Sequence, residues 1–235
     1  MTLLKSHFEQ VFDRIHKAES ACQREGEVKL LAVSKTKPAE MVREACELGQ
    51  REFGESYLQE ALVKIDALSD IHDIVWHFIG PIQSNKTRDI ASHFHWVHSV
   101  DRLKIAKRLN DQRPDELPPL NICLQVNISG EASKSGVTLD NLEALAKAVA
   151  ELPNLSLRGL MAIPAPAPDK EQQRIPLRAM KQALETINQT LGLNMDTLSM
   201  GMTDDLEAAI EEGSTMVRIG TALFGARTYS NQQSR

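Results

Sequence analysis

The chain has 235 residues, of which 42% are hydrophobic, 25% charged and 4% aromatic. This composition is that of an ordinary globular protein, and it excludes a disordered, collagenous or disulfide-stapled chain. The formal net charge is −5, and Lys and Arg are spread along the sequence. The dense basic surface that a nucleic-acid backbone needs is therefore excluded as well.

Neither a targeting signal nor a membrane span is visible in the sequence. The N-terminal stretch carries Lys5, Glu9 and Asp13, so it lacks the apolar core of a signal peptide. No window is long and apolar enough to cross a bilayer. The three cysteines lack the short paired spacings of metal or redox motifs, so they are expected to be reduced core residues. We expect a cytoplasmic protein without nucleic-acid or membrane partners.

Apolar residues recur every three or four positions from Leu3 to Cys22, which predicts an amphipathic helix at the start of the chain. The short apolar run 28–34 is then typical of a parallel strand buried on both faces. Further strands are predicted at 52–54, 75–79, 96–99, 121–128, 155–161, 197–200 and 216–219. Helices are predicted between them at 38–49, 58–68, 84–92, 101–109, 139–152, 172–191 and 204–212.

Local signals mark the start of two of these helices. Pro38 is suited to the first turn of the helix over 38–49, and Gly49 is suited to its end. Ser56 and Gln59 have the spacing of a capping box ahead of the helix over 58–68.

Eight strands separated by helices require right-handed crossovers and a parallel sheet, and their number and length predict a closed (β/α)8 barrel of the TIM type. The helix at the start of the chain is an addition to that barrel. An open doubly wound sheet is the alternative, but no G-x-G-x-x-G motif follows the first strand. Because no linker divides residues 1–235, we expect a single domain, with a frayed polar tail over 229–235.

A lysine follows the first predicted strand directly. In a β/α barrel the C-terminal ends of the strands form the working face, and Lys35 lies there. Partial burial favours the neutral amine, which attacks an aldehyde to form a Schiff base. The alternative is a lysine on the rim whose ammonium group lies in water.

Two loops late in the chain are suited to phosphate binding. Segments 199–204 and 218–221 follow the seventh and eighth strands, and each offers a glycine and a hydroxyl. Barrels often hold phosphate at these two loops, where backbone N–H groups and helix N-termini attract anions. The alternative is ordinary turn chemistry, with Thr203 or Asp204 as a helix N-cap. An amine that reacts with aldehydes and a phosphate site together indicate pyridoxal 5′-phosphate, which carries both groups.

Several motifs resemble those of the pyridoxal phosphate homeostasis protein family, and the match covers nearly the whole chain. These motifs are LAVSKTKP at 31–38, FGE at 53–55, WHFIG at 76–80, QSNK at 83–86, SKSG at 133–136, SMGM at 199–202 and VRIGT at 217–221. The resemblance implies a barrel similar to that of alanine racemase, with the cofactor held as an internal aldimine. It further implies a carrier or regulator of the cofactor pool, without an established catalytic activity.

The resemblance also implies a role for individual residues. Lys35 is the Schiff-base lysine, and Arg218 faces the pyridine nitrogen. A guanidinium keeps its proton, so it donates to a neutral ring nitrogen and leaves the ring a poorer electron sink. The alternative for Arg218 is an ion pair with a neighbouring carboxylate. The remaining cofactor-binding residues are those of the two loops: Ser199, Gly220 and Thr221 at the phosphate, with Met200 and Gly201 beside them.

One position departs from the family pattern. The family usually has Asn before the tyrosine of Phe-Gly-Glu-Asn-Tyr, whereas this chain has Ser56 before Tyr57. Serine is shorter and lacks the amide donor, so the contact of Ser56 with the cofactor is in question. As a helix N-cap, serine is nearly equivalent to asparagine.

Other polar residues have simpler interpretations. His93, His95 and His98 lie close together in the sequence, but no carboxylate accompanies them at helical spacing, so no metal site is expected. His77 is interpreted as a hydrogen-bonded histidine of the barrel. Lys134 is interpreted as a solvated lysine that the main site does not need, the alternative being a second amine that captures or passes on the aldehyde.

Three functions are compared. The first is a non-catalytic protein that holds pyridoxal phosphate and delivers it to dependent apoenzymes, as a monomer. The second is a weak amino-acid racemase, although racemases of this barrel type resemble larger dimers in which the other subunit contributes a tyrosine. The third is an enzyme acting on sugar phosphates without a cofactor.

Overall fold

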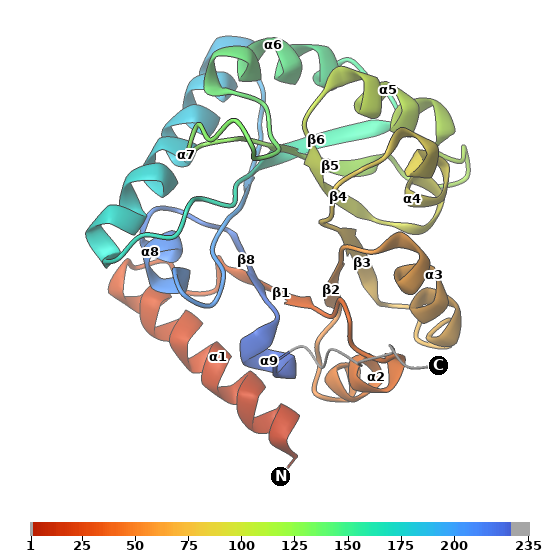
Figure 1. Cartoon of the computed structure of the whole chain (residues 1–235), viewed down its shortest axis with the longest axis vertical. Helices are drawn as coiled ribbons and strands as arrows, with labels where there is room; N and C mark the ends of the chain where they lie inside the picture. Colours follow the sequence, from red (N-terminus) through yellow and green to blue (C-terminus); the bar gives the residue numbers. More distant parts are fainter. Residues whose placement is uncertain (1, 227–235) are drawn as a thin grey trace, which may run out of the picture.

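The predicted alternation of strands and helices closes into a barrel (Figure 1). The computed structural model describes residues 2–226. All eight predicted strands are present, all are parallel, and each pairs with its neighbour in the sequence until the last pairs with the first. The strands are β1 (Lys29–Val33), β2 (Glu52–Glu55), β3 (Val75–Phe78), β4 (Trp96–Val100), β5 (Leu120–Gln125), β6 (Leu155–Met161), β7 (Thr197–Ser199) and β8 (Met216–Ile219).

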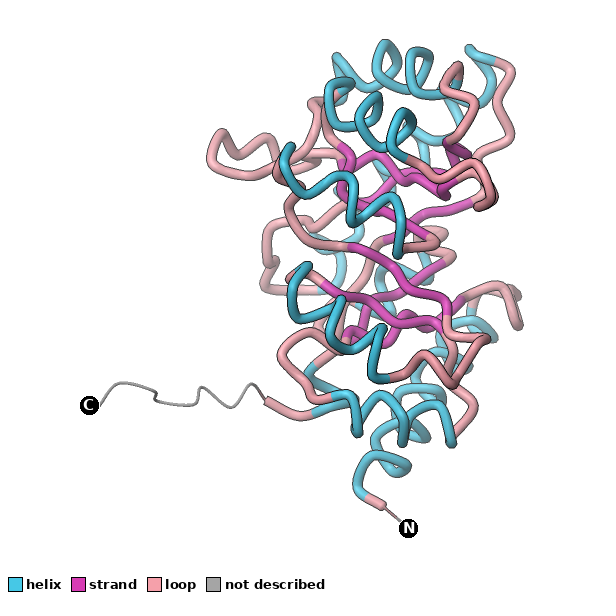
Figure 2. The backbone as a smooth tube through the Cα atoms, turned by 90° about the vertical axis from the view of Figure 1, so that its right-hand side faces the viewer, coloured by secondary structure: helices cyan, strands magenta, loops and turns pink. Residues whose placement is uncertain are grey.

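Helices surround the barrel on the outside, and the view from the side shows the strands in the interior (Figure 2). A 3₁₀ turn, Ser84–Lys86, precedes α4. The helices are α1 (Leu3–Ala21), α2 (Ala39–Glu47), α3 (Leu58–Ala67), α4 (Thr87–His93), α5 (Leu103–Gln112), α6 (Leu139–Ala150), α7 (Lys170–Leu191), α8 (Leu206–Glu211) and α9 (Thr221–Phe224). No helix in the part of the chain that the structure describes is long and apolar enough to cross a bilayer.

Two separate cores follow from the alternation of side chains along the strands. The larger core lies between strands and helices, and strand residues such as Ile122, Leu160 and Val217 belong to it. Their neighbours face the inside of the barrel, where Trp96, Cys123 and Met161 form a second, smaller cluster. Several other side chains of that interior are polar, among them His77, His98, Ser199 and Arg218, which is unusual because barrel interiors are mostly filled with branched apolar residues.

The additional helix α1 packs on α8 and α9, as the red and blue ribbons show (Figure 1). Its apolar residues recur on one face, and five of them are buried: Leu4, Phe8, Val11, Ile15 and Ala18. Phe8 meets the ring of Phe224 edge-on at 6.3 Å between centroids. The first helix therefore covers the part of the barrel whose loops were predicted to bind phosphate.

Close packing of two strands explains one glycine. A Cβ atom on Gly159 would lie 1.7 Å from the carbonyl oxygen of Thr197 on the neighbouring strand β7. Any side chain at this position would push β6 and β7 apart, so closure of the barrel depends on a glycine here.

Several predicted boundaries are corrected. The capping box is wrong: α3 begins at Leu58 after Tyr57, which makes no side-chain cap, so Ser56 lies one residue too early. Pro38 is the N-cap of α2 and not part of its first turn. The strand predicted over 121–128 ends at Gln125, because beyond it only an isolated bridge from Val126 continues the pairing. The short helix α9 was not predicted, and the tail 229–235 lies outside the described residues.

Candidate functional site

Lys35 lies at the C-terminal end of β1, beside a cavity of about 400 Å³. The cavity opens among the loops that follow the strands, as predicted for the working face of a barrel. It is lined by Val33, Lys35, Ser56, Ile79, Ile163, Met202, Thr203, Asp204, Arg218, Gly220 and Thr221. Of the eight predicted cofactor residues, five therefore come together here.

The turn that carries Lys35 is held in an unusual backbone conformation. Thr36 has a φ of +66°, in the left-handed region that residues with a side chain rarely adopt. Its N–H group donates to Glu60 Oε1 at 2.6 Å, and the N–H of Lys37 donates to the carbonyl of Ser34 at 3.1 Å. These hydrogen bonds compensate for the backbone strain and fix the direction in which the chain leaves β1.

A buried cluster of charges lies behind this turn. The Lys64 ammonium donates to Glu55 Oε1, to Glu60 Oε1 and to the carbonyl of Ser34, each at 2.7 Å. The hydroxyl of Ser34 also donates to Glu55 Oε1, at 2.6 Å. Burial raises the pKa of Glu55, although the charge of Lys64 opposes that effect. The cluster joins the ends of β1 and β2 to α3 and so supports the position of Lys35.

Arg218 enters the cavity from inside the barrel and is buried. One guanidinium nitrogen donates to the carbonyl and the hydroxyl of Ser199, at 2.6 and 2.8 Å, and the other donates to the carbonyl of Ala162 at 3.0 Å. Burial lowers the pKa of Arg218 to about 10, against the opposing charge of Asp205, so the group stays protonated at neutral pH. No ion pair found within residues 2–226 includes Arg218, so the alternative of a paired barrel arginine is not what the structure shows.

The loops after β7 and β8 supply hydroxyl groups to the same cavity. Thr203 comes from the first loop and Thr221 from the second, next to Gly220. Neither Thr203 nor Asp204 caps α8, since that helix begins at Leu206 after Asp205. The carbonyl of Thr203 accepts a hydrogen bond from Arg14 of α1 at 2.8 Å, which ties this loop to the first helix.

Three predicted residues do not line the cavity. Ser199 is fully buried, with its hydroxyl bound to Arg218 and to His98 Nδ1 at 2.8 and 2.7 Å. Met200 belongs to the core between strands and helices. Gly201 serves the turn after β7: it has a φ of +101°, and its carbonyl accepts from the N–H of Arg218 at 2.9 Å.

Some lining residues escaped the sequence analysis. Thr203 was considered only as a helix cap, although its place in the motif 199–204 could have suggested more. Ile79 and Ile163 follow β3 and β6 and give the cavity its apolar walls. Their position just beyond a strand end is the same signal that singled out Lys35.

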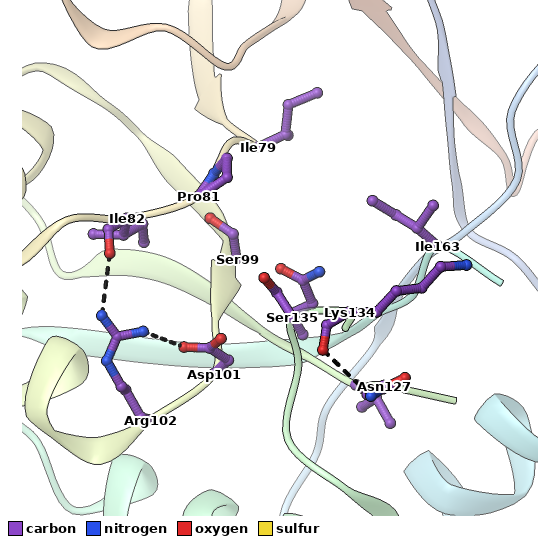
Figure 3. A pocket seen from close by; sticks show the side chains of 12 residues that line it. Ile79, Pro81, Ile82, Ser99, Asp101, Arg102, Asn127, Lys134, Ser135 and Ile163 are labelled. Atoms are coloured by element: carbon purple, nitrogen blue, oxygen red, sulfur yellow. Dashed lines mark hydrogen bonds and ion pairs between the residues drawn. The ribbon is translucent and has the colours of Figure 1, made fainter. Parts of the chain in front are cut away.

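A second cavity, of about 350 Å³, adjoins the first and shares Ile79 and Ile163 with it (Figure 3). Lys134 lines this second cavity and not the first, and its side chain extends toward Ile163. Its ammonium lies 3.3 Å from Glu131 Oε1. That Lys134 is dispensable for the main site stays a prediction.

The histidines singled out in the sequence make structural hydrogen bonds, and His93 lies outside the barrel on α4. His77 hydrogen-bonds to His98 at 2.8 Å and to Glu52 at 2.5 Å, as expected for a hydrogen-bonded barrel histidine. His95 Nδ1 accepts from the N–H of Trp76 at 2.9 Å. Among the residues described, no group of three or more His, Cys, Asp or Glu side chains is arranged to hold a metal ion.

Comparison with known proteins identifies the family and the fold. Residues 7–228 match the family model described as "Alanine racemase, N-terminal domain". Two relatives carry the name "Pyridoxal phosphate homeostasis protein". The relative from Pseudomonas aeruginosa is 60% identical, and the match covers 97% of this chain and 98% of that protein. The relative from Escherichia coli is 57% identical, and the match covers 95% of this chain and 96% of that protein.

Solved structures agree as well. PipY of Synechococcus elongatus, solved with PLP bound, is 34% identical to this chain and superposes on it with a TM-score of 0.79. The match covers 90% of this chain and 100% of the PipY chain. Alanine racemase of Corynebacterium glutamicum shares the fold, with a TM-score of 0.66 at 21% identity, and this chain spans 62% of its length. The chain belongs to the pyridoxal phosphate homeostasis protein family, built on the barrel of the alanine racemase N-terminal domain.

Proposed function

We propose that this protein binds pyridoxal 5′-phosphate through Lys35 and acts as a non-catalytic carrier of the cofactor. The observation that carries the proposal is that one cavity collects an amine, a guanidinium and two threonine hydroxyls at the ends of β1, β7 and β8. Relatives that bear the homeostasis name, and PipY with PLP bound, support the same choice of ligand.

The donor set fits the chemistry of this cofactor. Pyridoxal phosphate carries an aldehyde, an anionic phosphate and an aromatic ring with one nitrogen. The cavity offers the Lys35 amine for the aldehyde, the hydroxyls of Thr203 and Thr221 for the phosphate, the Arg218 guanidinium for the ring nitrogen, and the apolar Ile79 and Ile163 for the faces of the ring. Its volume of about 400 Å³ lies in the range of small-molecule sites.

Lys35 would hold the aldehyde end of the cofactor covalently. A neutral primary amine and an aldehyde would join there through a C=N bond, with the aldehyde oxygen and the two amine protons released as water. The step is reversible, so water can release the cofactor again. Reversibility is what a carrier requires.

The phosphate is held by the loops after β7 and β8. Thr203 and Thr221 offer hydroxyls at the cavity, with backbone N–H groups at the start of α9 beside Gly220. Ser199 was the expected hydroxyl of the first loop, but its oxygen already bonds to His98 and Arg218. We therefore assign this role to Thr203.

Arg218 donates to the pyridine nitrogen and leaves it unprotonated. A guanidinium has no acceptor atom and keeps its proton, so the ring is not converted into the strong electron sink that carbanion chemistry uses. Ser56 completes the wall near Lys35, and its hydroxyl is available because it does not cap α3.

The composition of the site favours a carrier over a racemase. Two-base racemisation needs an acid and a base on opposite faces of the substrate. Among the described residues that line the cavity, the side chains with acid–base chemistry are Lys35, Asp204 and Arg218, and no tyrosine or histidine is present. Tyr57 is 49% exposed and does not line the cavity. A monomeric state, delivery to apoenzymes and a cytoplasmic location remain predictions.

The test is a visible spectrum of the purified protein before and after borohydride reduction, followed by peptide mass analysis. We expect a yellow band that reduction removes, with the cofactor trapped on Lys35, and neither result in Lys35→Ala. Lys134→Ala is the matched control and keeps the band. A protein that cannot be loaded with pyridoxal phosphate would refute the proposal and favour a sugar-phosphate ligand. Racemisation of L-amino acids that disappears in Lys35→Ala would replace the carrier by an enzyme.

A further inference from the structure

A chain of hydrogen bonds crosses the inside of the barrel from Arg218 to Glu52. Arg218 donates to the hydroxyl of Ser199 at 2.8 Å, and that hydroxyl lies 2.7 Å from His98 Nδ1. His98 Nε2 lies 2.8 Å from His77 Nδ1, and His77 Nε2 lies 2.5 Å from Glu52 Oε2. Five strands contribute one residue each, and the chain ends at the first residue of β2.

The hydrogen bonds of this chain all point in the same direction. Arg218 can only donate, so the Ser199 oxygen accepts from it and its own hydrogen is free to bond His98 Nδ1. His98 then carries its hydrogen on Nε2 and donates to His77, which carries its hydrogen on Nε2 and donates to the Glu52 carboxylate. One arrangement of hydrogens therefore satisfies every atom between the guanidinium and the carboxylate.

Burial agrees with this assignment of hydrogens. Burial lowers the pKa of both His77 and His98, although hydrogen bonding to Glu52 opposes the effect at His77. Both rings are thus neutral, with one donor and one acceptor nitrogen each. Burial by itself would raise the pKa of Glu52, but the hydrogen bond from His77 and the nearby Lys29 lower it, so Glu52 is charged.

These hydrogen-bonded residues do more than fill the interior of the barrel. A barrel interior can be filled with branched apolar side chains at lower cost, because buried polar groups lose water and must all be paired. Arg218 has no carboxylate bonded to it within residues 2–226, and the Glu52 carboxylate is joined to it only through Ser199, His98 and His77. Between the two lie hydrogen-bonded neutral groups, which polarise one another in a medium of low dielectric.

We propose that Glu52, acting through His77, His98 and Ser199, is the positioning residue that holds Arg218 in one orientation toward the cavity. The inference rests on the proposed function in one respect, namely that Arg218 meets the ring of the bound cofactor. Glu52 itself lies at the opposite end of its strand from the cavity and does not line it. Its carboxylate supplies a counter-charge through hydrogen bonds, in addition to Asp205, whose charge acts on Arg218 without a hydrogen bond between them.

The first test uses the unmodified protein without cofactor. ¹⁵N NMR of the histidine rings distinguishes the two neutral tautomers, and the signals of His77 and His98 are identified by their loss in His77→Gln and His98→Gln. We expect both rings to be neutral, with the hydrogen on Nε2, at neutral pH. A hydrogen on Nδ1 of either ring, or a charged ring, would break the direction of the chain and overturn the inference.

The second test uses the protein loaded with pyridoxal phosphate. Glu52→Gln keeps the shape of the side chain but removes its charge, and Asp73→Asn is the control, because Asp73 pairs with Arg51 at the same end of the barrel and is outside the chain. Relative to this control, Glu52→Gln is expected to shift the visible band of the bound cofactor and to weaken binding about threefold.

The outcomes separate the two proposals. If Glu52→Gln matches Asp73→Asn in band position and affinity, the positioning role is refuted while the carrier function stands. If the unmodified protein binds no pyridoxal phosphate, the proposed function fails, and the tautomers in the cofactor-free protein decide the chain of hydrogen bonds on their own.

Discussion

Lys64 shows how much the site depends on a single buried charge. Its side chain is 4% exposed, and its ammonium is enclosed by two carboxylates and a carbonyl. Lys64→Met leaves the carboxylate of Glu55 buried without its partner, which is expected to lower the free energy of unfolding by about 3 kcal/mol at neutral pH. The loss is expected to be smaller near pH 5, because Glu55, whose pKa burial already raises, can then take up a proton.

Urea unfolding at the two pH values measures this loss. Lys17→Met is the control, because Lys17 forms an exposed pair with Asp13 on α1 and exposed pairs contribute under about 1 kcal/mol. A loss at Lys64 as small as that at Lys17 would show that the cluster behind the Lys35 turn is not a stabilising unit.

The buried histidines make stability depend on pH. In the folded protein, burial lowers the pKa of His77, His95 and His98 below the usual value, so these rings stay neutral while the unfolded chain takes up protons. Stability from these groups is therefore full above about pH 6.5 and is lost as the pH falls below it, by up to ~1.4 kcal/mol per pH unit for each proton.

Chemical denaturation in steps between neutral pH and about pH 5 measures this slope. His16→Gln, at an exposed position of α1, is expected to leave the slope unchanged. Stability that stays level over this range would mean that the barrel histidines are protonated in the fold, which would also contradict the hydrogen-bonded chain.

Individual site residues were predictable where their position alone carried the signal. Lys35 directly follows an apolar strand, so its place on the working face could be predicted from periodicity. Ser199 and Thr203 lie four residues apart in one motif, and the sequence does not say which hydroxyl reaches the cavity. That depends on the face of β7 to which Ser199 points, and on a turn at Gly201 that takes Thr203 to the rim.

At the scale of elements, α1 supports the phosphate loops and not just the outer surface. Arg14 donates to Glu207 through two nitrogens and to the carbonyl of Thr203 through one of them. Arg14→Ala frees the loop after β7, so affinity for pyridoxal phosphate is expected to fall about fivefold because a phosphate ligand loses its fixed position.

Titration of the visible band against added cofactor gives the affinity of each variant. Lys17→Ala, on the same helix, removes an exposed charge that does not contact the loop and is expected to leave the affinity unchanged. Equal affinity of Arg14→Ala and the unmodified protein would contradict the assignment of Thr203 to the phosphate.

Elements were predictable in number and type, but less so in their ends. The eight strands and the helices between them follow from apolar periodicity, whereas α9 has four residues, too few for any periodic signal. The start of α3 was misjudged because Ser56 has the right residue type for a cap. Its place is decided by tertiary contact: a Cβ on Gly80 would lie 2.2 Å from the Ser56 carbonyl oxygen, so the two segments touch.

For the whole molecule, closure of the barrel was predictable from the count of strands, but the strength of each pairing was not. β5 and β6 pair along their whole length, from Leu120 with Leu155 to Gln125 with Met161. β7 and β8 share a single register pair, Ser199 with Met216. The shortest strand pairing of the barrel therefore lies between the two strands whose loops hold the proposed phosphate site, and we call this pairing the seam between β7 and β8. Backbone hydrogen bonds from Thr215, Met200 and Arg218 extend it on both sides of the paired residues.

A ligand that bridges these two loops is expected to stabilise the seam between β7 and β8. Such a ligand binds only when β7 and β8 are paired. At a concentration of one hundred times its Kd, it therefore adds about 2.7 kcal/mol to the free energy needed to separate the two strands. In hydrogen exchange of the cofactor-free protein, amides of β7 and β8 are expected to exchange at least about tenfold faster than those of β5 and β6. Pyridoxal phosphate is expected to slow the former selectively.

Two variants separate the phosphate from the covalent bond in this effect. Lys35→Ala cannot form the bond to the aldehyde but keeps Thr203 and Thr221, so at saturating cofactor it is expected to retain slower exchange at the seam. The double variant Thr203→Ala with Thr221→Ala is expected to lose most of it while it still forms the bond. If the covalent bond alone slowed exchange, the pairing of β7 and β8 would be stabilised through Lys35 at the end of β1. The phosphate would then have to be bound elsewhere.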